Sequence, residues 1–221
     1  PALLGAEIRR IDQRDALLTI DPRTGEATEA TWPKADIVMS NPPFLGGKKF
    51  VTELGETNAM QLRTVYKNRV PGLADLVTYW FFNANAQIMA GQLSAAGLVC
   101  TNSLRDGFGN AVVRRLNGST PIYDAWSDNE WVNEGAAVRV SIMAFANPTM
   151  ASGFDKRLNG EPVDVITADL TSSSTDMTMV KPLPSNMGAA FQGTTRSGAF
   201  DIAGDVARQW LMHINPNGKP N

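Results

Sequence analysis

The segment Asn41-Pro42-Pro43-Phe44 combines residues that could bind and orient the amino group of a nucleic-acid base. Such a nitrogen is a poor nucleophile because its lone pair is delocalised into the ring. The Asn41 side-chain oxygen and the Pro42 carbonyl could accept its N–H hydrogens and so direct the lone pair. Successive prolines fix φ and restrict the residue before each of them, so these carbonyl directions are set in advance. Phe44 could stack on a base flipped out of a duplex.

The segments around this motif predict alternating strands and helices. Residues 35–40 form a short apolar run without alternation, which is typical of a central strand buried on both faces of a parallel sheet. The motif therefore follows a strand directly, which argues against a plain loop that merely contains two prolines. An amphipathic helix is predicted before Gly91 by apolar residues at spacings of three and four, namely Leu73, Leu76, Val77, Trp80, Ala84 and Ile88.

The next segments continue the alternation. A strand is predicted over residues 97–101, a mobile polar loop over 106–109 and a helix over 111–116. Strands at 121–126 and 137–145 are expected to pair antiparallel at a sheet edge, across a loop that contains Trp131. This order predicts a doubly wound α/β sheet with ligands at the carboxyl ends of its strands.

Composition narrows the class of protein. The 221 residues are 43% hydrophobic and 19% charged, which predicts one globular domain with an appendage. We find neither a run of roughly 20 apolar residues nor a signal pattern, so no membrane partner and a cytoplasmic location are expected. A net charge of −2 argues neither for nor against binding of DNA, because DNA-binding proteins usually concentrate Lys and Arg on one face. The single cysteine, Cys100, is expected to be buried and inert, and no metal site is expected at His213, the only histidine.

The motif and its surroundings resemble a known group of enzymes. Asn41-Pro42-Pro43-Phe44 is similar to the fourth conserved motif of amino-group DNA methyltransferases, in the version used on adenine. Further segments extend this to a resemblance, over most of residues 8–147, to the single-chain type IIL restriction-modification enzymes. These segments are residues 45–49, 74–81 (Ala-Asp-Leu-Val-Thr-Tyr-Trp-Phe), 97–103, 124–128 and 135–141. Residues 191–193 and 198–202 are similar to the stretch by which that family passes into its target-recognition domain.

The resemblance implies a fold, a reaction and a set of site residues. The fold would be an α/β, Rossmann-like class I methyltransferase sheet, and the reaction a methyl transfer from S-adenosyl-L-methionine to N6 of a flipped adenine in double-stranded DNA. The segment Asn41-Pro42-Pro43-Phe44 would be catalytic, and Asp15 with Ala16 would approach the adenine ring of the cofactor. Lys48 and Lys49 would meet the DNA backbone.

One expected motif is missing. The family's glycine-rich cofactor turn occurs nowhere in this sequence, and Gly107-Phe108-Gly109 does not replace it because it follows a later strand. We therefore expect an incomplete sheet whose first cofactor-binding strands belong to an upstream part of a longer polypeptide. The expected division is a catalytic part at 1–150, a loop or boundary region at 151–183, and the beginning of a target-recognition module at 184–221 with a helix at 206–213.

Two alternatives remain. The first is a methyltransferase that acts on an amino group in RNA or protein, because those families also use Asn-Pro-Pro followed by an aromatic residue. The second is a non-catalytic DNA-recognition fragment. The residues that flank the motif favour the DNA enzyme, and the intact motif argues against a decayed parent.

Overall fold

The computed structural model consists of two compact units, Pro1–Met179 and Val180–Asn221, which are described separately. The described residues are 12–105, 107–133, 136–172, 183–189, 193 and 202–213. Most of the predicted passage at 191–202 therefore lies outside them. The second unit contains a short 3-10 helix, η4 (Pro184–Asn186), and one α-helix, α7 (Gly204–Met212), which confirms the helix predicted at 206–213.

A mixed six-stranded sheet forms the centre of the first unit. β3 and β4 run parallel, β6 runs antiparallel to both β4 and β5, and β7 runs parallel to β5 and antiparallel to β8. The order across the sheet is β3 (Ile37–Ser40), β4 (Ala95–Thr101), β6 (Ala136–Ala146), β5 (Ile122–Asn133), β7 (Arg157–Leu158) and β8 (Glu161–Pro162). The expected α/β class is confirmed, with a sheet whose strands run in mixed directions.

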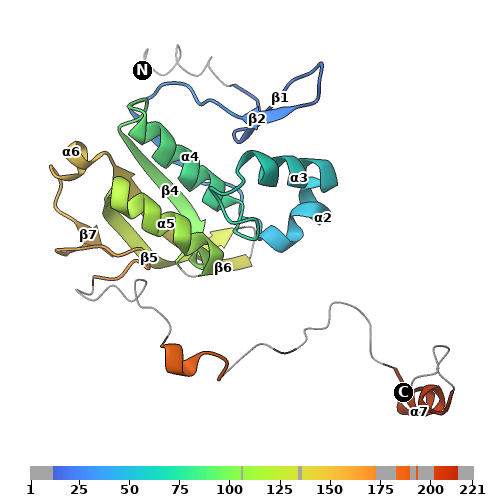
Figure 1. The fold of residues 1–221 in the computed structure, drawn as a ribbon. Coiled ribbons are helices and arrows are strands. Elements are labelled where there is room, and N and C mark those ends of the chain that lie inside the picture. Colours follow the sequence, from blue (N-terminus) through green and yellow to red (C-terminus); the bar gives the residue numbers. More distant parts are fainter. Residues whose placement is uncertain are drawn as a thin grey trace. The chain divides into compact units, whose positions relative to one another are not determined.

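Two helices pack across one face of this sheet. Figure 1 shows α4 (Val77–Met89) and α5 (Gly107–Ser119) side by side over the strands. Phe81 of α4 and Phe145 of β6 are fully buried and stack with their ring centroids 5.7 Å apart. Burial of such rings is the main source of stability in this layer. Cys100 of β4 lies in the same core, as predicted, and burial raises the pKa of its thiol.

Shorter elements lie beside the sheet and form a second core. They are β1 (Leu18–Ile20), β2 (Ala27–Glu29), η1 (Gly47–Lys49), α2 (Phe50–Leu54) and α3 (Glu56–Val65), with η2 (Asn102–Leu104) and α6 (Pro148–Ala151) elsewhere in the unit. Phe50, Tyr66 and Tyr79 are fully buried in this second core, where the Tyr66 and Tyr79 rings meet edge to face at 5.1 Å. Among the described helices, none is both long and apolar enough to cross a membrane.

Strand β3 is present as predicted, but the expectation that it is central and buried on both faces is wrong for the described residues. Met39 is 84% exposed and Ile37 is 53% exposed. β3 is the first strand of the sheet order. Among the described residues, the helices α4 and α5 cover only one face of the sheet, which is the face opposite the side chains of Ile37 and Met39. These apolar side chains of an edge strand are therefore left exposed.

Both predicted helices begin at other residues than expected. α4 begins at Val77 rather than at Leu73, because residues 71–76 form turns and the Asp75 carboxylate accepts a hydrogen bond from Val77 N at 3.2 Å. α5 begins at Gly107, so the mobile loop predicted at 106–109 is wrong for residues 107–109. Gly109 is buried, and a Cβ there would lie 2.7 Å from Leu104 Cδ1. Glycine at position 109 lets α5 lie close to Leu104.

The predicted antiparallel pairing of the two later strands is confirmed, but their place is not an edge. β6 lies between β4 and β5, and β5 lies between β6 and β7. β5 also extends through Trp131, which was expected in a loop. The strands β7 and β8 follow, and three residues after them, Ile166, Ala168 and Leu170, are buried in the core of the sheet. These residues lie in the region predicted as a loop.

Candidate functional site

The motif loop begins where β3 ends. Asn41 directly follows the strand and is exposed, Pro42 is buried, and Pro43 is exposed. The Asn41 side chain has no hydrogen-bond partner among the described residues, so its amide is available to a ligand. Burial of Pro42 between two exposed neighbours anchors the loop to the protein while Asn41 stays accessible.

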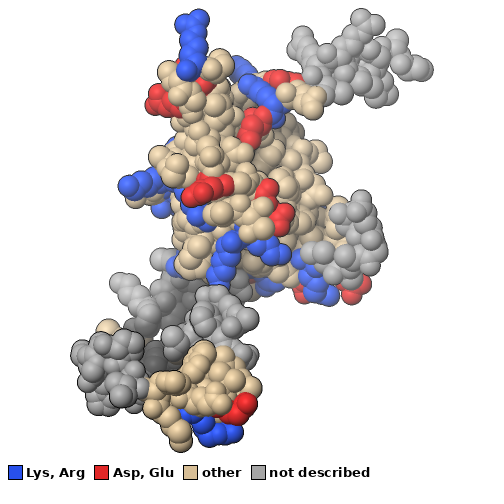
Figure 2. All heavy atoms as spheres, turned by 90° about the vertical axis from the view of Figure 1, so that its right-hand side faces the viewer, with Lys and Arg blue, Asp and Glu red and all other residues tan. Residues whose placement is uncertain are grey.

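The residues after the prolines have different surroundings. Phe44 is partly buried and packs against the core that lies between the sheet and α4. Lys48 and Lys49 are exposed in η1. On the face of the first unit seen in Figure 2, Lys and Arg side chains are interspersed with Asp and Glu rather than gathered in one basic area. Any attraction of this face for phosphate would therefore be local.

A cavity of about 390 Å³ lies beside the loop. Pro43 lines it together with Asp15, Ala16 and Trp80, all of which are far from Pro43 in the sequence. The remaining wall is mainly apolar and includes Leu17, Leu18, Leu54, Leu62 and Leu76. The structure thus brings the two predicted cofactor residues and one predicted catalytic residue to one cavity, whereas Asn41, Pro42, Phe44, Lys48 and Lys49 do not line it.

Hydrogen bonds between side chains and the backbone hold the Asp15 segment at this wall. Asp15 Oδ1 accepts from Leu17 N at 2.7 Å and from Leu18 N at 2.9 Å, which closes a tight turn. Trp32 Nε1 donates to Ala16 O at 2.6 Å, and Tyr66 Oη donates to Leu17 O at 3.0 Å. One oxygen of the Asp15 carboxylate is thus used within the protein. Oδ2 has no partner among the described residues.

Trp80, Trp32 and Tyr66 are site residues that sequence reasoning missed. The Trp32 and Trp80 rings lie 5.6 Å apart, and Trp80 forms a wall of the cavity. In the sequence, Trp80 is only one of several apolar positions of a helix. Burial raises the pKa of Tyr66, which keeps its phenol protonated as a donor to Leu17. Only the proximity of distant segments could have revealed these roles.

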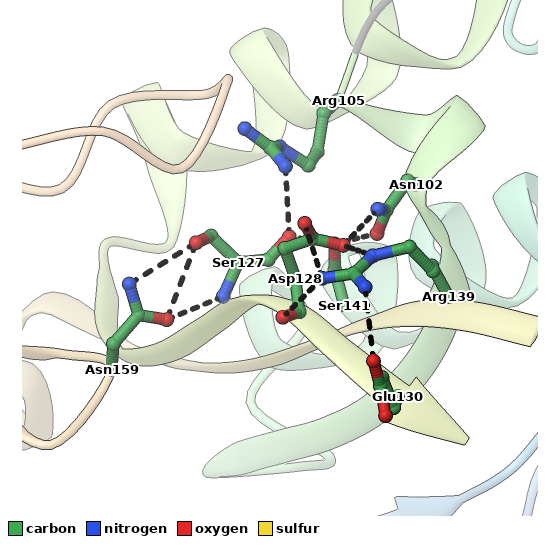
Figure 3. A network of polar contacts seen from close by, with 8 residues as sticks. All are labelled: Asn102, Arg105, Ser127, Asp128, Glu130, Arg139, Ser141 and Asn159. Carbon is green, nitrogen blue, oxygen red and sulfur yellow. Dashed lines mark hydrogen bonds and ion pairs between the residues drawn. The ribbon is translucent and has the colours of Figure 1, made fainter. Parts of the chain in front are cut away.

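A separate polar cluster connects β5 and β6 with the segment that follows β4 (Figure 3). Arg139 of β6 contacts Asp128 of β5 through two hydrogen bonds, Nε to Oδ1 at 2.6 Å and Nη2 to Oδ2 at 2.7 Å. Asn102 Nδ2, just after β4, donates to the same Oδ1 at 2.6 Å. The hydrogen bonds from Arg139 and then from Asn102 lower the pKa of Asp128 to about 2.

The cluster fixes an irregularity in β5. The register between β5 and β6 shifts between Trp126 and Asn129, so Ser127 and Asp128 form a bulge. Ser141 Oγ and Arg105 Nη1 both donate to Ser127 O, at 2.8 and 2.9 Å. Figure 3 shows these side chains converging from separate strands and from the segment after β4. The bulge is therefore held from both sides.

No group of three or more His, Cys, Asp or Glu side chains that could hold a metal ion occurs in the part of the chain that the structure describes. His213 follows α7 in the second unit, where its backbone N donates to Trp210 O at 3.2 Å. The candidate site therefore consists of the motif Asn41-Pro42-Pro43-Phe44 and the mainly apolar cavity beside it.

Comparison of the sequence with known protein families identifies one family. Residues 9–155 match the family model of the MmeI DNA-methyltransferase domain. No curated protein matches. A solved structure of the type IIL restriction-modification enzyme MmeI in complex with DNA is similar over 62% of this chain, with 23% sequence identity and a TM-score of 0.48. The chain spans 20% of that protein's length. Because the family model covers well over half of the sequence, this chain belongs to the family of the MmeI DNA-methyltransferase domain.

Proposed function

We propose that this chain carries the base-binding loop of a DNA methyltransferase that acts on N6 of an adenine flipped out of double-stranded DNA, with S-adenosylmethionine as methyl donor. The observation that carries the proposal is the meeting of Pro43, Asp15 and Trp80 at one apolar cavity, next to an accessible Asn41. The match to a methyltransferase family supports the reaction class.

Asn41 and Pro42 are proposed to bind the amino group of the base. The Asn41 Oδ1 and the Pro42 carbonyl would each accept one N6–H, which draws electron density toward the nitrogen and aims its lone pair away from the loop. Because both prolines have a fixed φ, little entropy is lost when the base binds. Phe44 is proposed to replace part of the stacking that the base loses when it leaves the duplex.

The cavity suits the adenine end of the cofactor. Its volume of about 390 Å³ lies within the usual range for small-ligand pockets, and its wall is mainly apolar. Trp80 and Pro43 line the cavity and could contact a flat ring, and Asp15 Oδ2 could accept a hydrogen bond from an amino group. When bound, S-adenosylmethionine would supply a methyl group carried by a positively charged sulfur, and N6 would lose a proton on accepting it.

Other parts of a longer polypeptide are proposed to complete the site. The uncovered edge of β3, with exposed Ile37 and Met39, supports a further part of the same domain packing there. That part would supply the glycine-rich turn for the polar end of the cofactor. Lys48 and Lys49 are proposed to contact phosphates of the DNA, and a downstream module to read its sequence.

The test uses the complete protein that contains this chain. Duplex DNA is incubated with labelled S-adenosylmethionine, and the nucleosides released by digestion are separated and identified by mass spectrometry. The proposal expects N6-methyladenine, and it expects this product to disappear with Asn41→Ala. Methylation of RNA or protein instead, or of cytosine, would overturn it.

A further inference from the structure

The loop that follows the motif is bound to the turn before α4 by paired hydrogen bonds. Leu45 N donates to Asp75 Oδ1 at 3.2 Å, and Leu76 N donates to Leu45 O at 2.8 Å. The same Asp75 oxygen accepts from Val77 N at 3.2 Å, at the first residue of α4. One carboxylate therefore connects the start of this helix with the loop.

Gly47 makes the closest approach between the two segments. A Cβ on Gly47 would lie 2.6 Å from the Leu73 carbonyl carbon, 2.7 Å from Leu73 O and 2.8 Å from Ala74 O. These are backbone atoms that cannot rotate away. The neighbouring Gly46 has no atom within 4 Å of its Cβ position. Glycine at position 47 is thus required by contact, whereas Gly46 has space for a side chain.

Arg63 of α3 closes the arrangement from a third element. Its Nη2 donates to Gly47 O at 2.8 Å and its Nε donates to Gly72 O at 3.2 Å, one on each segment. Its guanidinium also lies 5.4 Å from the centre of the Phe50 ring. Arg63 therefore bridges the motif loop and the turn while its own position is fixed by an aromatic ring.

We propose that Asp75, Gly47 and Arg63 are positioning residues for methyl transfer, which set where the Asn41 and Pro42 oxygens lie. The inference rests on the proposed function. Leu45 is only a few residues after Pro42, and the rigid prolines transmit any displacement of Leu45 to these oxygens. Misplacement of a reacting group by about 1 Å can cost roughly 100-fold in rate. Substrate affinity depends on other contacts and is affected much less.

The first experiment compares Gly47→Ala with the matched control Gly46→Ala in the complete protein. Single-turnover methylation of duplex DNA is measured at saturating cofactor and DNA, together with the binding constants of both. Gly47→Ala is expected to lower the rate roughly 100-fold while both binding constants stay near wild type. Gly46→Ala should stay within about twofold of the wild-type rate. Equal rates for the two variants would overturn the inference.

The second experiment uses Asp75, because it does not depend on steric overlap. Asp75→Ala removes the acceptor for Leu45 N, whereas Asp75→Asn keeps an oxygen that can accept the same bond. The rate should fall with alanine and be largely restored with asparagine. Fluorescence of 2-aminopurine at the target position should still report a flipped base in both variants, since flipping precedes alignment.

The outcomes separate this inference from the proposed function. The proposed function holds if wild type produces N6-methyladenine and Asn41→Ala does not. In that case, wild-type rates in Gly47→Ala and Asp75→Ala would overturn the positioning role alone. If both variants instead lose melting temperature and keep their rate per folded molecule, the contacts serve folding only and the inference is again overturned. Failure of wild type to methylate adenine would overturn both.

Discussion

Substitution of Phe44 separates a ring that stacks on the substrate from a ring that only supports the loop. In the structure Phe44 is partly buried against the core beside α4 and follows the exposed Pro43. Part of the ring surface therefore contacts the protein, and part is accessible to a ligand. Phe44→Ala removes both contacts, Phe44→Leu keeps most of the apolar packing without a ring, and Phe44→Tyr keeps the ring.

The burial of Phe44 determines the expected size of each effect. Truncation of a fully buried Phe to Ala costs about 3–5 kcal/mol of folding free energy, so a partly buried Phe44 should cost about 1–2 kcal/mol. Loss of base stacking should cost a further ~1–3 kcal/mol in the reaction, which corresponds to a decrease in rate of about 5- to 150-fold. Leucine should lose most of the rate and little stability, while tyrosine should keep much of both.

The assay measures DNA-methylation rate and melting temperature for all three variants in the complete protein. Rates are compared per folded molecule, so that a loss of stability is not mistaken for a loss of catalysis. The reasoning would be refuted if Phe44→Leu methylates DNA at the wild-type rate. A large fall in melting temperature with tyrosine would further show that the ring edge is enclosed, because the buried hydroxyl would lack a partner.

The remaining predictions concern the amide, the cavity, the cofactor and the polar cluster. Asn41→Ala should abolish methylation while cofactor binding, measured by titration, stays near wild type; more than a tenth of the wild-type rate would contradict its role. Trp80→Leu should weaken cofactor binding by about 1 kcal/mol or more, whereas Trp80→Phe should retain most of it; calorimetry on the complete protein distinguishes these. This chain alone should bind S-adenosylmethionine weakly or not at all, because its sequence lacks the glycine-rich turn, and micromolar binding in calorimetry would show otherwise. Because the pKa of Asp128 is lowered to about 2 in the folded state, its stabilisation is present above its ordinary pKa near 4 and is lost as the pH falls toward 2. The melting temperature of Asp128→Asn should therefore vary less over this pH range than that of wild type, and an equal variation would contradict the prediction.

The sequence by itself determined the local elements and the chemical motif. The apolar run at 35–40 and the prolines after it predict a strand followed by a fixed loop, and the apolar residues spaced from Leu73 to Ile88 predict a helix, which begins at Val77. These features depend on neighbours along the chain, so they can be predicted from spacing and residue type. The later strands β5 and β6 were predicted to pair for the same reason, since they are adjacent in sequence.

The tertiary structure decided which distant residues share the site. Asp15 and Pro43 meet at one cavity together with Trp80, and Tyr66 holds part of its wall through a hydrogen bond to Leu17 O. It also decided that Gly47 is a contact residue while Gly46 is not, because the difference depends on the backbone of Leu73 and Ala74. Contacts between segments far apart in the sequence leave no periodic signal, so one sequence predicts the motif but not the residues that hold it in place.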